Sequence, residues 1–249
     1  MKIAVAGGTG QVGTHVVEVA RERGHEVVVL SRGNGVDLVA GTGVADALAG
    51  VDIVVDVSSV FTLKTAESVS FFETVSRTLL AAEEDAGVPH HVALSIVGID
   101  NATEGYYAGK QAQERIVQSG LVPWTLLRAT QFHEFAPQVF GSVKLGPVSA
   151  APKMRTQPIA AREVAERLVE LAEGAPAGRV RDLAGPREES LPDMVRAYAR
   201  ATGQGRWVIG IPMPGETGRQ QRDGSALPGP DADRGRQTYA EWVAALPHA

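Results

Sequence analysis

Short apolar runs alternate with longer amphipathic stretches along the first half of the chain. The apolar runs are rich in Val and Ile and lie at 2–7, 25–32, 52–59, 90–97 and 123–130. Between them, apolar residues recur at helical spacing, in a segment ending at Gly24, a weak short segment near 43–50, a long one at about 65–87, and one around 104–120. Strands that are apolar throughout and separated by helices predict an α/β fold with a parallel sheet covered on both faces.

The pattern changes after residue 130. Residues 160–174 and 191–203 predict helices, 179–185 predicts a strand, and a last helix is expected within 234–246. Residues 212–235 are dense in Gly, Pro, Asp and Arg and show no periodicity. They predict a long loop, either a lid over a site or a disordered segment.

Composition narrows the class of protein. The chain has 249 residues, 44% of them hydrophobic, a formal net charge of −5 and no cysteine. The mild acidity and the lack of a long basic run argue against a nucleic-acid partner, and no stretch reaches the ~20 apolar residues of a membrane span. The lack of cysteine excludes disulfides and thiolate chemistry and is compatible with a reducing cytosol. Together with the lack of a membrane span, it leads us to expect a soluble cytoplasmic protein without a membrane partner.

A glycine-rich turn joins the first strand to the first helix. Gly7, Gly10 and Gly13 form a G-x-x-G-x-x-G pattern between a strand and a helix, the context in which glycines let the backbone approach a pyrophosphate at a helix N-terminus. The pattern predicts a Rossmann-like doubly wound sheet with a dinucleotide-binding core at 1–130. Residues 131–249 are expected to be a small substrate-binding part packed on that core, in a single compact domain overall.

The end of the second strand bears on the choice of dinucleotide. It ends in Ser31 and Arg32, with no carboxylate to accept hydrogen bonds from a ribose 2′-hydroxyl. An arginine beside a serine suits a 2′-phosphate, which favours NADP(H) over NAD(H). Asp37 and Leu38 follow a few residues later and either line the adenine or belong to an ordinary loop.

Tyr106 and Lys110 are four residues apart in a segment expected to be helical, so both side chains project from one face. A phenol has a pKa of about 10 and exchanges protons poorly at neutral pH unless a nearby cation favours the phenolate. Lys110 would supply that cation. Tyr107, the adjacent residue, is an alternative inward-facing tyrosine, and spacing does not decide between the two; if Tyr106 is the catalytic residue, we expect Tyr107 to contact the substrate.

The order of these motifs resembles that of the atypical short-chain dehydrogenase/reductases, in particular their NmrA-like, NAD(P)H-binding branch. The resemblance covers nearly the whole chain and rests on GGTGQVG at 7–13, LSR at 30–32, LSIVGID at 94–100, YYAGK at 106–110 and WTLLRATQFHEF at 124–135.

The resemblance implies roles for individual residues. It places Thr9, Gln11 and Val12 over the pyrophosphate with the three glycines, and assigns Arg32 to the 2′-phosphate. It places Val57, Ser58 and Ser59 beside the cofactor. It also identifies Ser95, Tyr106 and Lys110 as a catalytic triad, in which Lys110 additionally holds the nicotinamide ribose and Ser95 hydrogen-bonds the substrate oxygen.

Other polar residues have different interpretations. Gln131, Phe132 and His133 follow the strand at 123–130 and are expected to face a substrate pocket; with no second histidine at helical spacing, no metal site is predicted. Arg128 is expected to pair with a carboxylate inside the fold, and His90 and His91 to mark an exposed strand start. Arg162 stands where relatives frequently carry an acid.

Three functions remain compatible with the sequence. The first is an NADP(H)-dependent reductase of a carbonyl or quinone-like small molecule. The second is a dinucleotide-binding sensor or regulator without turnover, and the third is an epimerase or dehydratase that uses the cofactor transiently. The retained tyrosine and lysine favour the enzyme.

Overall fold

The computed structural model describes residues 1–62, 64–101, 104–142, 144–145, 148–204 and 207–247. The chain forms two compact units. The first unit comprises residues 1–128 and 162–181, and the second comprises residues 129–161 and 182–249. The segment 162–181, which follows the predicted core in sequence, therefore belongs to the first unit.

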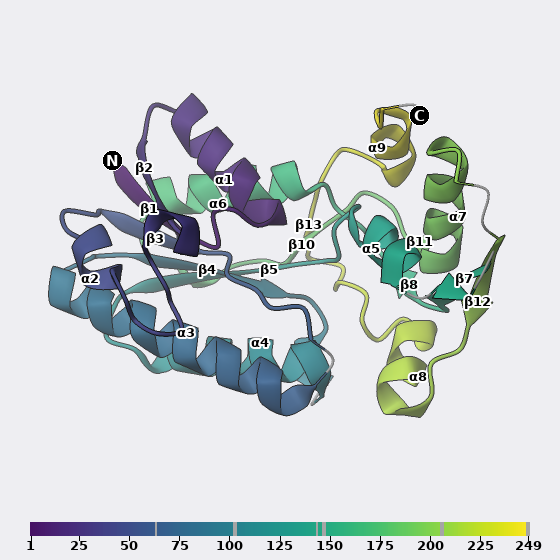
Figure 1. The fold of residues 1–249 in the computed structure, drawn as a ribbon, viewed down its shortest axis with the longest axis horizontal. Coiled ribbons are helices and arrows are strands. Elements are labelled where there is room, and N and C mark those ends of the chain that lie inside the picture. The colour runs from purple at the N-terminus through teal and green to yellow at the C-terminus, as the bar shows by residue number, and fades with distance from the viewer. Residues whose placement is uncertain (63, 102–103, 143, 146–147, 205–206, 248–249) are drawn as a thin grey trace. The chain divides into compact units, whose positions relative to one another are not determined.

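The first unit is built on a sheet in the order β5-β4-β3-β1-β2 (Figure 1). β1 pairs in parallel with β2 and β3, and β3 pairs in parallel with β4. The strands are β1 (Lys2–Ala6), β2 (Glu26–Leu30), β3 (Ile53–Asp56), β4 (His91–Ile96) and β5 (Trp124–Ala129), with the short β9 (Gly178–Arg179) beside β5. The predicted α/β fold with a Rossmann-like parallel sheet is confirmed.

Helices cover both faces of this sheet. In Figure 1, α1 and α6 lie on one face, and α3 and α4 pack together on the other. The helices are α1 (Gln11–Glu22), α2 (Val44–Ala47), α3 (Thr65–Ala86), α4 (Gly105–Ser119) and α6 (Ala161–Glu173), with single 3₁₀ turns η1 (Arg32–Asn34) and η2 (Ile99–Asn101). α3 shows how the pattern determines the packing, since Phe72, Val75 and Leu79 recur on one buried stripe.

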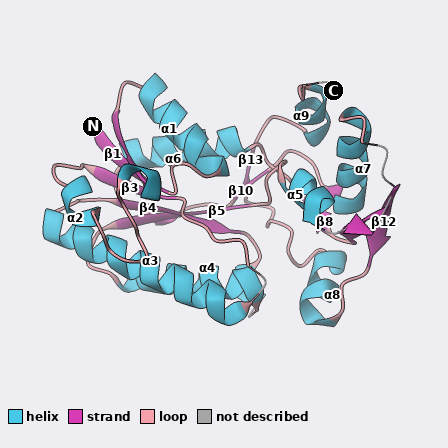
Figure 2. Cartoon of the chain, viewed as in Figure 1, coloured by secondary structure: helices cyan, strands magenta, loops and turns pink. Residues whose placement is uncertain are grey.

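The second unit has its own core. Buried residues from α5, α7 and α9, among them Phe140, Leu191, Met194 and Tyr239, pack together. β7 pairs with β12 in parallel and with β6 antiparallel, and β8 pairs antiparallel with β11. Its elements are α5 (Phe135–Ser142), β6 (Lys144–Leu145), β7 (Val148–Pro152), β8 (Arg155–Thr156), β10 (Leu183–Ala184), β11 (Glu189–Ser190), α7 (Leu191–Ala201), β12 (Trp207–Ile211), α8 (Gly215–Asp223), β13 (Asp233–Arg234) and α9 (Tyr239–Ala244). Figure 2 shows the helices of the chain in cyan and its strands in magenta.

The expectation of a long loop at residues 212–235 was partly wrong. Residues 212–235 contain α8 and β13, and α8 packs against β8. Gly218 permits this geometry, because a Cβ there would lie 2.0 Å from the Met213 carbonyl oxygen. The helix sequence GETGRQQRD has almost no apolar residue, so hydrophobic periodicity could not reveal it.

Two smaller expectations also differ from the structure. The strand expected at 179–185 is instead two short strands, β9 and β10. The last helix is shorter than expected and comprises only α9, whose N-terminus is capped by reciprocal hydrogen bonds between Thr238 and Glu241, a capping box. His90 and His91 are buried rather than exposed.

No helix among the described residues is long and apolar enough to cross a membrane. The described side chains also contain no group of three or more His, Asp or Glu placed to hold a metal ion.

Candidate functional site

The glycine turn between β1 and α1 is shaped for close backbone contacts. Gly7 has a φ of +77°, and a Cβ on it would lie 2.8 Å from the Val57 carbonyl oxygen. A Cβ on Gly13 would lie 2.1 Å from the Gly7 carbonyl oxygen. Real Cβ atoms do not approach backbone oxygen so closely, so the turn requires glycine at both positions.

The N-terminus of α1 is open to an anion. Gly10 is its N-cap, no side chain caps the helix, and no acidic residue lies in its first turn. Thr9 is exposed, whereas Val12 is buried and packs α1 into the core. The positive end of the helix dipole therefore faces outward without a competing carboxylate.

Two buried serine hydroxyls mark the ends of neighbouring strands. Ser58 and Ser95, which follow β3 and lie in β4, are only 5% and 4% exposed, and neither hydroxyl has a hydrogen-bond partner among the described residues. The Ser58 backbone N–H donates to the Asp56 carboxylate at 2.9 Å. Buried polar groups are nearly always satisfied, so these two hydroxyls are suited to a bound ligand.

The end of β2 presents a cation. Arg32 begins η1 and is exposed, with Ser31 before it. Asp37 accepts hydrogen bonds from the backbone N–H groups of Val39 and Ala40 at 2.9 and 3.1 Å, and these bonds, assisted by Arg32, hold the pKa of its carboxyl below the ordinary value. Leu38 packs against the core cluster that includes Leu30 and Val36.

Lys110 lies in α4, and its buried side chain reaches the backbone of β4. Its ammonium donates to the Leu94 carbonyl oxygen at 2.6 Å and to the Gln113 side-chain oxygen, and it lies 4.7 Å from the centre of the Phe72 ring. Burial lowers its pKa to about 8, even though the charge of Asp56 opposes the shift. The Lys110 ammonium is thus hydrogen-bonded to the carbonyl of the residue that precedes Ser95 in β4.

Tyr106 makes other contacts than those predicted from spacing. Its hydroxyl lies 3.2 Å from the Ser59 hydroxyl, and its ring packs edge-on against Phe72. Burial raises the pKa of its phenol, an effect that the Ser59 hydrogen bond only partly offsets. The Lys110 ammonium donates instead to the Leu94 carbonyl oxygen and the Gln113 side-chain oxygen. Tyr107, next in α4, is half-buried.

Asp56 and Gln113 complete this cluster and escaped sequence reasoning. The Gln113 amide donates to the Asp56 carboxylate at 2.7 Å, and both side chains are almost fully buried. A signal existed in each case: Asp56 ends an apolar strand, and Gln113 lies three residues after Lys110 on the same helix. Neither is recognisable alone, because buried polar residues often serve only packing.

Three of the residues expected to face a substrate, Gln131, Phe132 and His133, lie in the second unit. The Gln131 side chain accepts a hydrogen bond from the Thr156 hydroxyl at 2.6 Å, and Phe132 forms a β-bridge with Ile159. His133 is fully buried, its Nε2 lies 3.2 Å from the Gln237 carbonyl oxygen, and its ring packs against Tyr239 and Trp242. Burial lowers the pKa of His133 to about 4, so its imidazole is neutral at pH 7. Their substrate role stays a prediction.

Arg128 is held by carboxylates, as expected. Its guanidinium donates to Glu114 at 2.8 and 2.7 Å and to Asp100 at 2.6 and 2.9 Å. These partners outweigh burial and raise its pKa, so the charge is permanent.

The expectation for the histidine pair was wrong for a clear physical reason. The His91 Nδ1 lies 2.8 Å from the Glu83 carboxylate, and the His90 Nε2 lies 2.8 Å from the Thr125 hydroxyl. Each ring thus has a buried partner from another element, which an isolated strand sequence does not reveal.

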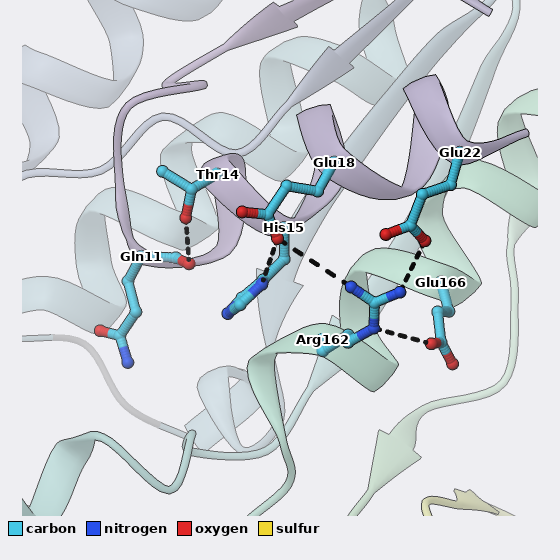
Figure 3. Close-up of polar contacts among 7 residues, drawn as sticks. All are labelled: Gln11, Thr14, His15, Glu18, Glu22, Arg162 and Glu166. Atoms are coloured by element: carbon cyan, nitrogen blue, oxygen red, sulfur yellow. Dashed lines mark hydrogen bonds and ion pairs between the residues drawn. The ribbon is translucent and has the colours of Figure 1, made fainter. Parts of the chain in front are cut away.

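Arg162 connects α6 to α1. Figure 3 shows its guanidinium between Glu18 and Glu22 of α1 and Glu166 of its own helix, at 4.0, 2.6 and 3.4 Å. On the same face of α1, the Thr14 hydroxyl donates to the Gln11 carbonyl oxygen at 3.2 Å. Arg162 therefore acts structurally here, holding together the two helices on one face of the sheet.

These features fit a dinucleotide. The turn at Gly7 and Gly13 leaves no room for side chains, the α1 terminus attracts an anion, and two buried hydroxyls find no partner within the described part of the chain. Together they provide the close approach, the charge complementarity and the hydrogen-bonding groups that a pyrophosphate and its sugars require.

Comparison with known proteins agrees with this geometry. A family described as NAD(P)H-binding matches residues 7–174. No curated protein matches the chain.

Solved structures show the same fold. An NADPH-dependent quinone oxidoreductase from Escherichia coli, QOR2, complexed with NADPH, is 18% identical, with 97% of this chain and 98% of that chain covered and a TM-score of 0.71. MoeE5 in complex with UDP-glucuronic acid and NAD is 16% identical, with 98% and 97% covered and a TM-score of 0.72. The NAD-dependent NDP-hexosamine 5,6-dehydratase TunA is 18% identical, with 98% and 95% covered and a TM-score of 0.71.

The family match spans most of the chain and includes the glycine turn, the Ser58 and Ser95 strand ends and the Lys110 helix. It confirms the resemblance to the atypical, NmrA-like short-chain dehydrogenase/reductases, and the chain belongs to the NAD(P)H-binding family.

Proposed function

We propose that this protein is an NADP(H)-dependent reductase of a carbonyl or quinone-like small molecule. The observation that carries the proposal is the buried Lys110 ammonium, hydrogen-bonded to the Leu94 carbonyl of β4, together with the buried hydroxyl of the next residue in that strand, Ser95, which has no hydrogen-bond partner among the described residues. A buried charge is costly unless it has partners or a function. A cation and a free hydroxyl at the end of a parallel strand are suited to a ribose and a substrate oxygen.

Each side chain has a separate task in this proposal. The bound dinucleotide supplies the hydride. Ser95 donates a hydrogen bond to the substrate oxygen as negative charge develops there, and Lys110 holds the nicotinamide ribose hydroxyls. Tyr106 donates the proton; its raised pKa keeps the phenol protonated at neutral pH, and Ser59 orients its hydroxyl.

Arg32 supports the preference for the phosphorylated dinucleotide. It is exposed at the end of β2, and the nearby Asp37 carboxylate is occupied by the N–H groups of its own loop. A carboxylate so engaged is less able to accept hydrogen bonds from a ribose 2′-hydroxyl, whereas the guanidinium suits a 2′-phosphate. The related structures contain NAD in one case and NADPH in another, so the preference of this chain for NADPH over NADH requires a direct binding test.

Titration with NADPH and NADH tests the cofactor. We expect tighter binding of NADPH by the native protein, and a loss of about ten- to a hundredfold in NADPH affinity on Arg32→Ala with little change for NADH. Arg77→Ala, an exposed arginine on α3, is the matched control. Equal affinities for the two dinucleotides in the native protein would contradict the assignment of Arg32.

The tyrosines provide the test of chemistry. NADPH oxidation is followed with a panel of quinones, ketones and aldehydes. Tyr106→Phe keeps the ring against Phe72 but removes the proton, and we expect turnover to fall by about 10²–10⁴-fold. Tyr107→Phe makes the same chemical change one residue away and should remain near native. A slow Tyr107→Phe with a normal Tyr106→Phe would transfer the role to Tyr107.

A regulator without turnover is the second candidate, and one observation favours it. The Tyr106 hydroxyl pairs with Ser59, and the Lys110 ammonium donates to Leu94 and Gln113, so the two residues do not act as a unit in this geometry. Tight NADPH binding with no turnover on any member of the panel would establish this alternative over the reductase.

A further inference from the structure

The second unit contains a pocket of about 610 Å³ lined by four cationic side chains. They come from four separate places: Lys153 follows β7, Arg155 lies in β8, Arg196 in α7 and Arg222 in α8. No acidic residue is among the lining residues, although the whole chain carries a net charge of −5. The lining side chains are therefore cationic, and carboxylates outside the lining, Glu188 and Asp193, pair with two of them.

Three of these cations retain hydrogen-bond donors. Among the described residues, the Lys153 ammonium has no side-chain partner. Arg196 uses one terminal nitrogen for Asp193 and its Nε for the Val208 carbonyl, which leaves the other terminal nitrogen. Arg222 uses one terminal nitrogen for the Met213 carbonyl, at 2.6 Å, and retains Nε and the other terminal nitrogen.

Arg155 differs from the other three. Glu188 takes its Nε and one terminal nitrogen, and the Asp223 carbonyl takes the other. Arg155 therefore helps to hold α8 to β8 and contributes a wall of the pocket rather than a ligand contact.

We propose that this pocket binds a phosphate-bearing small molecule, held by Lys153, Arg196 and Arg222. A single carboxylate has only two oxygens and engages one or two of these groups, whereas a phosphate or diphosphate presents several charged oxygens to donors arriving from three segments. Gly210 belongs to the same wall; a Cβ there would lie 3.3 Å from the Lys153 side chain, so glycine leaves that lysine room. The site lies wholly within the second unit and goes beyond the proposed reductase function.

Pyrophosphate is the probe that fits this description. Calorimetric titration of the full chain is carried out at low salt with saturating NADPH, which occupies the dinucleotide site. We expect saturable binding with one pyrophosphate per chain, weaker binding of inorganic phosphate, and still weaker binding of citrate, a carboxylate of similar charge. Citrate bound as tightly as pyrophosphate would overturn the phosphate assignment.

Two variants and a control locate the binding. Lys153→Gln and Arg222→Gln each remove one cation without breaking an ion pair, and each should weaken pyrophosphate binding about tenfold or more. Arg234→Gln changes an exposed cation of the same unit that lines no part of this pocket and should bind as the native protein does. No saturable binding, or equal binding by all three variants, would overturn the proposal.

The same variants separate this site from the dinucleotide site. NADPH affinity should be unchanged in Lys153→Gln and Arg222→Gln. Loss of pyrophosphate binding with intact NADPH binding supports the pocket even if no substrate is reduced. Parallel loss of both ligands would show that the variants act on the dinucleotide site or the fold, and would refute a separate pocket.

Discussion

Replacing Gly13 with alanine tests whether the glycine turn is as tightly packed as its geometry indicates. The added Cβ would lie 2.1 Å from the Gly7 carbonyl oxygen and 2.7 Å from the Gly8 Cα. Carbon and oxygen atoms need more than 3.0 Å, so the start of α1 and the turn must separate by roughly an ångström. No flexible side chain can absorb this shift, because the atoms concerned are backbone.

The magnitude follows from two separate effects. Overpacking of a well-packed position costs about 1–3 kcal/mol of unfolding free energy, and we expect the apo protein to lose stability in that range. The same shift moves the α1 N–H groups relative to the turn, and NADPH affinity should fall by about ten- to a hundredfold, as for the loss of one or two well-aligned hydrogen bonds to a charged group.

Urea denaturation of the apo protein measures the first effect and NADPH titration the second. Gly174→Ala is the matched control in the same unit, since a Cβ there would lie 3.5 Å from its nearest neighbour, the Leu171 carbonyl oxygen, which is an ordinary contact. It should change stability by less than about 0.5 kcal/mol. If Gly13→Ala is as stable as the native protein and binds NADPH equally well, the close packing of the turn is refuted.

Three further outcomes follow from buried and surface charges. The pKa of Lys110 is lowered to about 8 in the folded state, compared with about 10.4 in the unfolded chain. Between these two pH values the unfolded chain binds more protons than the folded protein, so the free energy of unfolding rises with pH. Lys110→Met should abolish this rise in denaturation curves measured across that range. Burial alone would lower the pKa of His91, but Glu83 raises it, so its stabilisation is full below about pH 6.5 and falls as pH rises through the raised pKa. Glu83→Ala, which leaves His91 buried without its partner, should cost about 3 kcal/mol at pH 6, and an unchanged midpoint of denaturation would contradict the pairing. Arg162→Ala removes a half-exposed cluster and should cost no more than about 1 kcal/mol, less at high salt; a salt-independent loss would point to packing instead.

The sequence predicted the sheet and most helices of the first unit because their signals are local. Apolar runs at strand spacing and a buried stripe such as that of α3 depend on neighbouring residues only. The glycine turn was also readable, since the steric demands at Gly7 and Gly13 leave no choice of residue. These features required no knowledge of contacts across the fold.

The features that sequence reasoning missed depend on distant partners. His91 is buried because Glu83 on α3 satisfies it, and Arg162 is explained by Glu22, 140 residues earlier in the chain. α8 is stabilised by contacts of the second unit and not by an apolar stripe, so the segment 212–235 was expected to be a loop. That segment supplies Arg222, so the cationic pocket depends on a helix that hydrophobic periodicity does not reveal.

The Tyr106 and Lys110 pair shows where spacing ceases to be informative. An i, i+4 relation places two Cα atoms on one helix face, but it does not determine where a four-carbon side chain ends. The Lys110 ammonium donates to oxygen atoms of Leu94 and Gln113 and is stabilised by the charge of Asp56. The Tyr106 hydroxyl is hydrogen-bonded to Ser59 instead. The i, i+4 spacing therefore identifies the two residues but not their contacts, which depend on oxygen atoms that other segments supply, the Leu94 carbonyl for the lysine and the Ser59 hydroxyl for the tyrosine.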